Sequence, residues 1–300
     1  MLDIAKLFVP FTRYPYQGRI VACPVCEAEG FRKVSGIDRR FKRLPTVMCL
    51  NCGLLYTNPM PTDEELGTYY AKYYRFDYQM AVGTPKPKHV AKRQVEVAHR
   101  FDALAGLLKP GAAVLDFGCG SGEFVSRMLD GGYDAHGFEP GEAYGSYAQA
   151  RLGERIRIAR WQDVAYDGKF DLVTCFHVVE HLNTPVAALE RITGWLAPGG
   201  KAYIEVPDLA PQNGRKGFGF FHFAHVVGFN HFNLLLAASR VGLTPVKTVS
   251  PTGVIFERGV GEAPEALAEK GRALTAAHFV GTSPGKQYLA YQRRKIAGRR

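Results

Sequence analysis

The sequence lacks any long apolar run, and no stretch approaches the about 18 consecutive apolar residues typical of a membrane-spanning helix. Its first ten residues include Asp3 and Lys6 and no extended apolar core, so they do not indicate a secretory signal peptide. No segment repeats along the chain. We therefore expect a soluble, cytoplasmic protein with no membrane partner.

Two common phosphate-binding patterns are absent as well. Residues 118–122 read G-C-G-S-G, which lacks the lysine of the G-x-x-x-x-G-K-[ST] loop, so no phosphate-gripping loop of that kind is indicated. The stretch also departs from the dinucleotide pattern G-x-G-x-x-G, because Gly122 comes one residue early and Glu123 holds the next place.

Cysteine is scarce, with 6 in 300 residues, but four of them form two C-x-x-C pairs, Cys23 with Cys26 and Cys49 with Cys52. This spacing favours metal binding in a reducing compartment over disulfides. Two such pairs predict a tetrahedral Zn²⁺ site in a zinc-ribbon-like module, with short strands over 32–34 and 46–48. Four protein ligands leave no open position for chemistry, so the site is expected to be structural. The alternative, four free thiols, does not explain the paired spacing.

The chain is basic, with a formal net charge of +10 and a pI near 9.3. Such a charge permits nucleic acid or an acidic substrate as a partner and requires neither. Part of the excess lies in the last eight residues, which fit a solvated helix end better than an RNA-binding patch. A second basic run, 39–43, lies between the cysteine pairs and is as easily a solvated loop.

The chain is organised around residues 112–129. The apolar run 112–115 predicts a buried strand that ends in an acidic residue and the glycine turn, and helical spacing of apolar residues follows over 123–129. Strand, glycine turn and helix open a nucleotide-binding α/β unit. The alternative is a turn that only closes this unit.

The residues of the turn indicate the charge of its ligand. Gly118 and Gly120 have no Cβ, so a ligand can lie directly on the backbone. Asp116, just before the turn, would repel a pyrophosphate but suits a cation that carries an ammonium and a sulfonium group. On charge alone, the turn favours S-adenosylmethionine over NAD.

Strands and helices alternate through the rest of the chain, which predicts an α/β fold with a doubly wound, Rossmann-like parallel sheet. Further strands are expected over 132–138, 157–159, 170–176, 201–206, 245–249 and 253–258, and helices over 142–152, 184–196, 232–241, 262–278 and 286–300. In front of them, a capping box of Thr62 and Glu65 opens a helix with Tyr69, Tyr70, Tyr73 and Tyr74, and a linker over 81–88 leads to a helix over 90–108. The predicted domains are the zinc module (1–60), a helical linker with substrate-side helices (61–110), the cofactor-binding domain (111–260) and C-terminal helices (261–300).

Polar residues follow several of the predicted strands at their carboxyl ends, where ligands bind in such sheets. They are Asp116, Glu139, Asp163 and the pair Phe176-His177. Glu139 comes 23 residues after Asp116, near the spacing at which a carboxylate on the second strand binds ribose hydroxyls.

Taken together, the segments 114–122, 138–140, 162–164, 170–182 and 196–200 resemble the class I S-adenosylmethionine-dependent methyltransferases, over about residues 90–250. The resemblance implies that Gly118 and Gly120 hold the methionine moiety, that Glu139 binds both ribose hydroxyls and that Asp163 accepts from the adenine amino group. The predicted cofactor set is completed by Asp116, Cys119, Val164 and Phe176. The four-cysteine module with the Thr62 helix also resembles methyltransferases of sugar and polysaccharide pathways.

The stretch His177-Val178-Val179-Glu180-His181 follows the fourth predicted strand of the α/β unit. Methyl transfer to oxygen needs a nucleophile without its proton, and a histidine with a pKa near 6.5 can accept that proton. His181 is the first candidate for this base, and His177 is expected nearer the cofactor. The alternative for His181 is a helix-start residue bonded to the backbone.

A metal is a second interpretation of this stretch. Ubiquinone-pathway and small-RNA 2′-O-methyltransferases carry E-x-x-E-H here and use it to hold a divalent ion. In this chain His177 replaces the first glutamate, so the resemblance does not favour a Mg²⁺ site.

An aromatic segment, 214–232, precedes the helix over 232–241 and is placed like a substrate lid. Its His222 and His225 are candidates for a second acid or base, and its rings suit stacking on a sugar or another ring. The alternative is an apolar loop that plugs the sheet edge.

These features favour an O-methyltransferase for a small acceptor, a sugar or another secondary metabolite, with a pocket built from the tyrosine helix and segment 214–232. The second hypothesis is an RNA methyltransferase with a basic stripe of Arg39, Arg40, Lys42 and Arg43. The third is a non-catalytic zinc-ribbon interaction protein. The two C-terminal helices are candidates for a homodimer contact.

Overall fold

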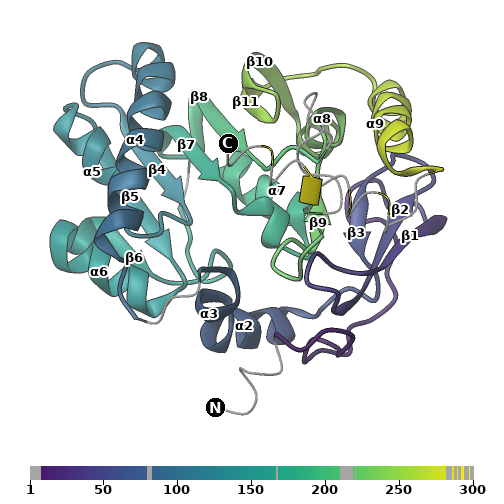
Figure 1. Ribbon diagram of the computed structural model, residues 1–300. Helices are drawn as coiled ribbons and strands as arrows, with labels where there is room; N and C mark the ends of the chain where they lie inside the picture. Colours follow the sequence, from purple (N-terminus) through teal and green to yellow (C-terminus); the bar gives the residue numbers. More distant parts are fainter. Residues whose placement is uncertain are drawn as a thin grey trace.

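The computed structural model describes residues 8–79, 83–166, 168–209, 219 and 221–281, with five single positions between 286 and 297. Phe218 and Phe220 of the aromatic segment, most of the helix expected over 286–300 and most of the basic C-terminal run lie outside the described residues. Figure 1 shows two sheets, with helices α2 and α3 between them at the lower edge.

The larger sheet has seven strands in the order β10-β11-β8-β7-β4-β5-β6. The five strands from β8 to β6 are parallel, whereas β11 runs antiparallel to β8 and to β10. Their bounds are β4 (Ala113–Phe117), β5 (Asp134–Glu139), β6 (Ile156–Ile158), β7 (Phe170–Phe176), β8 (Leu196–Glu205), β10 (Leu243–Ser250) and β11 (Gly253–Arg258). This arrangement confirms the predicted doubly wound Rossmann-like sheet.

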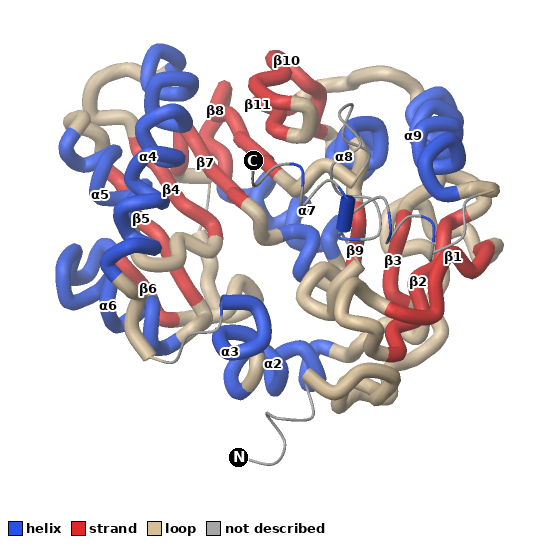
Figure 2. The backbone as a smooth tube through the Cα atoms, viewed as in Figure 1, coloured by secondary structure: helices blue, strands red, loops and turns tan. Residues whose placement is uncertain are grey.

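Helices cover both faces of this sheet (Figure 2). On one side lie α4 (Pro87–Leu104), α5 (Glu123–Asp130) and α6 (Glu142–Leu152), and on the other α7 (Pro185–Trp195) and α8 (His231–Ser239). Consecutive residues of a strand point to opposite faces, so Val114 packs in the core with Phe124 and Leu115 packs in the core with Trp195. Three short 3₁₀ turns, η1 (Ala105–Leu107), η2 (Gly153–Arg155) and η3 (Val179–His181), complete this part of the chain.

The smaller sheet belongs to the four-cysteine module, with one exception. It contains β1 (Phe31–Ile37), β2 (Arg43–Cys49) and β3 (Leu55–Thr57), and its last strand, β9 (Val227–Gly228), comes from the segment before α8. Leu55 pairs with Gly228 and Tyr56 with Val227. The sequence did not predict this pairing, which joins the module to a segment that lies far away along the chain.

The predicted capping box is confirmed. Thr62 accepts from the backbone N–H of Glu65, and the Glu65 carboxylate accepts from the N–H of Thr62. The helix is interrupted at Tyr73, which ends α2 (Asp63–Lys72) before α3 (Tyr74–Gln79). Asn183 donates to the carbonyl of Pro61 at 3.1 Å, which places the start of α2 beside the loop that precedes α7.

The last described helix, α9 (Pro264–Phe279), packs against α8 and the second cysteine pair. Asn233 of α8 donates to the carbonyl of Cys52 at 2.7 Å. A Cβ at Gly271 would lie 2.8 Å from the same oxygen, so only glycine fits there. Across the described parts of the chain, no helix is long and apolar enough to cross a membrane.

Candidate active site and four-cysteine centre

A buried carboxylate lies at the carboxyl edge of the large sheet. Asp116 on β4 is 3% exposed, and its Oδ1 accepts a hydrogen bond from Oγ1 of Thr174 on β7 at 2.8 Å. Burial raises the pKa of Asp116 to about 7, while the hydrogen bond from Thr174 and the charge of Arg100 act in the opposite direction. Asp116 therefore changes its charge near neutral pH, and a cation beside it would favour the ionised form.

The glycine turn after β4 is packed on one side and open on the other. Gly118 has a φ of +72°, and a Cβ there would lie 2.7 Å from Cγ2 of Val178. Gly120 also has a positive φ, but nothing lies within 4 Å of the place where its Cβ would be. The turn thus contacts the stretch that leads to His181 and keeps open space over Gly120, as a ligand lying on the backbone requires.

The neighbouring strand brings Glu139 to the same turn. Its Oε2 accepts from the N–H of Gly120 at 3.1 Å, and its Oε1 accepts from the N–H of Gly141 at 2.9 Å. Cys119 is buried beneath the turn and donates its N–H to the carbonyl of Phe138 at 2.9 Å. The structure therefore brings Asp116, the turn and Glu139 together at one edge.

At the end of β7, Phe176 and His177 meet a charged network. The Phe176 ring packs edge-on against Phe124, and the guanidinium of Arg100 from α4 lies 4.2 Å above its centre. His177 has a φ of 56°, a left-handed conformation that is rare for a non-glycine residue, and its Nε2 lies 3.2 Å from Oε1 of Glu205.

Glu205 of β8 holds this network together. Its carboxylate accepts two hydrogen bonds from Arg100, both at 3.2 Å, and one from the hydroxyl of Tyr203 at 3.0 Å. Burial acts to raise the pKa of Glu205, but the hydrogen bonds from His177 and Arg100 outweigh it and lower the pKa to about 2. Glu205 is therefore an anion that fixes the His177 ring.

His181 ends η3 and is largely buried. Its Nδ1 lies 2.6 Å from the carbonyl oxygen of Ala224 and 2.8 Å from the hydroxyl of Tyr70, and its Nε2 lies 3.6 Å from Oε1 of Glu180. Burial lowers the pKa of His181 to about 4, so the ring is neutral at pH 7. The expected pKa near 6.5 does not apply to this environment. The alternative role predicted for it, a bond to the backbone, is present, and it leaves Nε2 as the basic nitrogen.

Aromatic rings form a wall around His181. Tyr70 and Tyr74 meet its ring edge-on with centroid distances of 5.8 and 5.9 Å, and His225 meets it at 4.9 Å. Tyr70 and Tyr74 are half-buried, whereas Tyr69 is buried beneath them. The predicted tyrosine helix and segment 214–232 thus meet at His181, and an acceptor pocket there stays a prediction.

Glu180, His181 and His225 can offer ligand atoms within 4.8 Å of one another. One carboxylate and two imidazoles are not the oxygen-rich set that Mg²⁺ prefers. These ligand atoms therefore do not favour Mg²⁺, and neither does the sequence, in which His177 replaces the first glutamate of E-x-x-E-H.

Asp163, predicted to bind the adenine amino group, and Val164, of the predicted cofactor set, follow β6. Asp163 is exposed in the turn after β6, and its carboxylate pairs with Arg160 of the same turn at 2.9 Å. Val164 is buried, and its carbonyl accepts from Arg191 of α7 at 2.7 Å. Both follow the carboxyl end of β6, and their contact with a cofactor stays a prediction.

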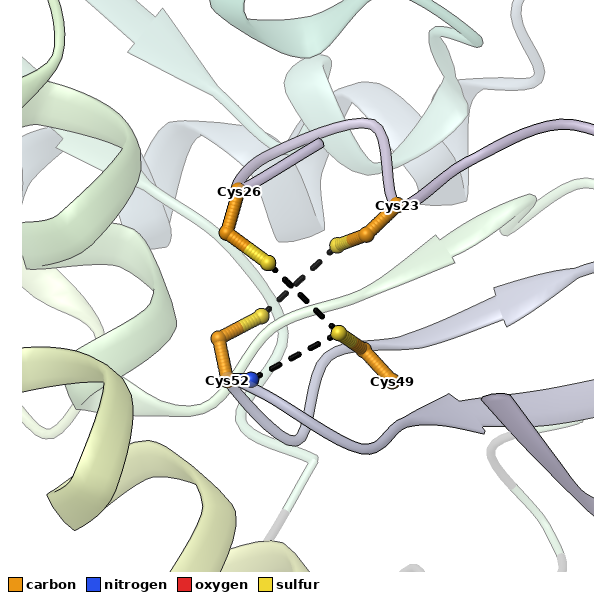
Figure 3. Close-up of side chains that lie close together, drawn as sticks. All are labelled: Cys23, Cys26, Cys49 and Cys52. Atoms are coloured by element: carbon orange, nitrogen blue, oxygen red, sulfur yellow. Dashed lines mark hydrogen bonds between the residues drawn. The ribbon is translucent and has the colours of Figure 1, made fainter. Parts of the chain in front are cut away.

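The four cysteines converge (Figure 3). Cys23 and Cys52 have their sulfurs 3.6 Å apart, Cys26 and Cys49 have theirs 3.5 Å apart, and all four lie within 4.8 Å of one another. A tetrahedron of sulfurs at about 2.3 Å from one ion has edges of about 3.8 Å. The side chains therefore fit the predicted Zn²⁺ site, and a backbone N–H supports it, since Cys52 donates to the sulfur of Cys49.

The basic run between the cysteine pairs is not the exposed stripe that the RNA hypothesis requires. Lys42 is 0% exposed, and its ammonium donates to Oγ1 of Thr12. Arg40 is half-buried and forms an ion pair with the fully buried Asp77. Two of the four predicted residues thus contribute to the interior.

Sequence reasoning missed several residues of the site. Glu205 holds His177 and is itself bound by Arg100, Thr174 binds Asp116, and Ala224 binds His181 through its carbonyl. Glu205 is the next-to-last residue of the strand predicted over 201–206, so its place near the carboxyl edge could have marked it. Ala224 has no functional side chain, and no sequence signal could have found it.

Comparison with known proteins agrees with this geometry. Residues 89–248 match the family model described as a methyltransferase domain. The ubiquinone biosynthesis O-methyltransferase of Pseudomonas aeruginosa (strain UCBPP-PA14) is 31% identical over 121 residues, which cover 37% of this chain and 50% of that protein. Its counterpart in Xanthomonas axonopodis pv. citri (strain 306) is 29% identical over 139 residues, 44% of this chain and 56% of that protein. The chain spans about half the length of the curated relatives it matches.

Among solved structures, the Burkholderia thailandensis 1,6-didemethyltoxoflavin-N1-methyltransferase matches with a TM-score of 0.51 and 16% identity, over 70% of this chain and 97% of that one. At this identity the match concerns the fold. Since the family model covers more than half of the sequence, the chain belongs to the class I S-adenosylmethionine-dependent methyltransferases, with a four-cysteine module in front.

Proposed function

We propose that this protein transfers a methyl group to an oxygen atom of a small ring-bearing acceptor, a sugar or another secondary metabolite. The observation that carries the proposal is the position of His181, which lies between the glycine turn, through Val178, and the aromatic wall of Tyr70, Tyr74 and His225. The matched relatives are named O-methyltransferases, which supports oxygen as the accepting atom.

The cofactor half of the site fits S-adenosylmethionine. The open space over Gly120 would receive it, Glu139 would bind its ribose hydroxyls, and Asp116 would offset its positive charge. When bound, the cofactor supplies a methyl group on a positively charged sulfur. Gly118, Cys119, Asp163, Val164 and Phe176 complete the proposed binding set.

The acceptor half of the site would position a ring and remove a proton. Aromatic side chains suit stacking on the faces of sugars and planar rings. Because Nδ1 of His181 is bound to the Ala224 carbonyl, Nε2 would take the acceptor's hydroxyl proton, and the Glu180 carboxylate at 3.6 Å would stabilise the resulting imidazolium. His177 and His225 would orient the acceptor.

We also propose that the four cysteines hold one structural Zn²⁺. The sulfur spacing matches a tetrahedral site, and four protein ligands leave no position for substrate. The RNA hypothesis is less well supported, because Lys42 is buried and Arg40 is paired with Asp77.

The test is a methyl-transfer assay that follows release of S-adenosylhomocysteine with a panel of nucleotide-sugars, hydroxylated aromatic compounds and RNAs. Methyl transfer to a hydroxyl of one of the first two classes is expected. Turnover with RNA alone, or methylation of nitrogen or carbon only, would overturn the proposal.

A further inference from the structure

The backbone of Ala224 lies between two buried histidines. Its carbonyl oxygen lies 2.6 Å from Nδ1 of His181, and its N–H donates to Nδ1 of His222 at 3.2 Å. Ala224 and His222 are both 0% exposed. The backbone of one residue therefore contacts both imidazole rings: the peptide group that follows Ala224 contacts His181 through its carbonyl, and the peptide group that precedes it contacts His222 through its N–H.

This arrangement determines where each ring carries its proton. A carbonyl oxygen cannot donate, so Nδ1 of His181 carries the hydrogen, and the hydroxyl of Tyr70 donates to the same carbonyl at 3.0 Å. Nδ1 of His222 accepts from Ala224, so the proton of His222 lies on Nε2. The two rings thus have opposite tautomers.

The far side of His222 is held by a second buried group. Its Nε2 lies 3.3 Å from Oδ2 of Asp77 on α3, and the same oxygen accepts from the hydroxyl of Tyr69 at 2.5 Å. Asp77 is 0% exposed and forms its ion pair with Arg40, which comes from the turn between β1 and β2. The chain of contacts therefore runs from the four-cysteine module to His181.

Segment 222–228 is fixed at both ends. The N–H of His225 donates to the carbonyl of His222 at 2.9 Å, which closes a turn, and β9 pairs with β3 directly after it. This turn carries the Ala224 carbonyl that contacts His181. Its position thus depends on Asp77 and on the sheet of the module.

We infer that His222 is a positioning residue that fixes the Nδ1–H tautomer of His181 through the backbone of Ala224, and that Arg40 and Asp77 hold His222 in place. His222 is therefore not the second acid or base considered from the sequence. The inference rests on the proposed function only where it treats His181 as the base, because the tautomers belong to the protein itself.

The test is long-range ¹H–¹⁵N NMR of the full-length protein with ¹⁵N-labelled histidine, at pH 7.5 and without cofactor. His181 is assigned from the His181→Gln variant and His222 from the variants below. The expected result is a proton on Nδ1 of His181 and on Nε2 of His222. A His181 protonated on Nε2 in the wild-type protein would overturn the inference without any variant.

Two variants of His222 separate positioning from bulk packing. His222→Asn retains an acceptor near the place of Nδ1 and should preserve the His181 pattern, whereas His222→Leu removes it and should give a mixture of tautomers at His181. In His222→Leu, kcat should fall about tenfold or more while the affinity for S-adenosylmethionine stays within twofold. An unchanged His181 tautomer in His222→Leu would contradict the inference.

A further variant keeps the test decisive if His222→Leu does not fold. Tyr70→Phe removes the competing hydroxyl, and His181 should still carry its proton on Nδ1; a shift to Nε2 would show that Tyr70 sets the tautomer instead. If the wild-type protein transfers no methyl group to any acceptor, the proposed function fails while the NMR result still decides this inference.

Discussion

Thr174 donates its hydroxyl hydrogen to Asp116 across two neighbouring parallel strands, over 2.8 Å. This contact does not fully offset the burial of the carboxyl group, whose pKa is raised to about 7. The site thus holds a group that a positive ligand can ionise near neutral pH.

The first prediction is that cofactor binding releases protons. At pH 7 about half of the Asp116 carboxyl groups are protonated in the free protein, and a cation beside them lowers the pKa, so binding should release about half a proton. The affinity should accordingly rise from pH 6 to pH 8. Calorimetry in two buffers with different ionisation enthalpies measures this release. It should disappear in Asp116→Asn and persist in Glu142→Gln, an exposed position on α6. Equal enthalpies in both buffers for the wild type would contradict it.

The second prediction concerns the carboxylates themselves. Asp116→Ala and Glu139→Ala should each abolish measurable binding of S-adenosylmethionine, because one loses the negative charge and the other the group that lies across the glycine turn. Glu142→Ala is the matched control and should bind like the wild type. Wild-type affinity in both site variants would reject the cofactor site.

The third prediction concerns the base. His181→Ala should bind S-adenosylmethionine normally but turn over about 10²-fold or more slowly. His99→Ala, exposed on α4, is the control. Because burial lowers the pKa of His181 to about 4, its charge does not change between pH 6 and 8, and kcat should show no step near 6.5 from this residue. An unchanged rate in the variant would remove His181 as the base.

The fourth prediction concerns the metal. Elemental analysis should find one zinc per chain, and strong chelation should unfold the β1–β3 region, seen as loss of hydrogen-exchange protection there. Cys49→Ser should lower zinc content, while Cys175→Ala, a buried thiol on β7 outside the cluster, should not. A wild-type protein with no bound metal would discard the zinc site.

The fifth prediction concerns stability in acid. Burial lowers the pKa of both His181 and His222 below the usual 6.5, so unfolding takes up protons below that pH. Their contribution to the free energy of unfolding is complete above pH 6.5. It is lost as the pH falls toward the pKa values of the two histidines in the folded protein. Urea unfolding at pH 7.5, 6 and 5 should therefore show a smaller loss of unfolding free energy with falling pH in His222→Asn than in the wild type.

Asp116 acts in the opposite direction, since its raised pKa favours the folded state below about pH 4 and this contribution is lost as the pH rises through 7. It is common to both proteins, so it cancels in the comparison.

Much of the large sheet could be predicted from the sequence. The strand over 170–176 and the helix over 142–152 have the predicted bounds, because apolar runs and glycine or proline breaks mark their ends locally. The glycine turn, the two carboxylates and the cysteine pairs were found for the same reason. The domain boundaries stay predictions.

What the sequence could not supply depends on contacts between distant segments. The two residues of β9 carry no periodic pattern, and their pairing with β3 is fixed only when the chain has folded. Charge patterning places Lys42 in solvent, but the folded chain buries it. The spacing of tyrosines on α2 likewise does not predict that Tyr69 contacts Asp77 while Tyr70 contacts His181.

The pairing of β9 with β3 affects how this chain can be divided into fragments. A fragment cut to the family-matched residues 89–248 would lose β1, β2 and β3, and β3 is the strand that pairs with β9. Val226, Val227 and Phe229, which have no exposure in the full chain, would then face water beside a bare backbone edge that invites pairing with other molecules. The family-matched region is therefore not a self-sufficient piece, because the four-cysteine module covers part of its interior.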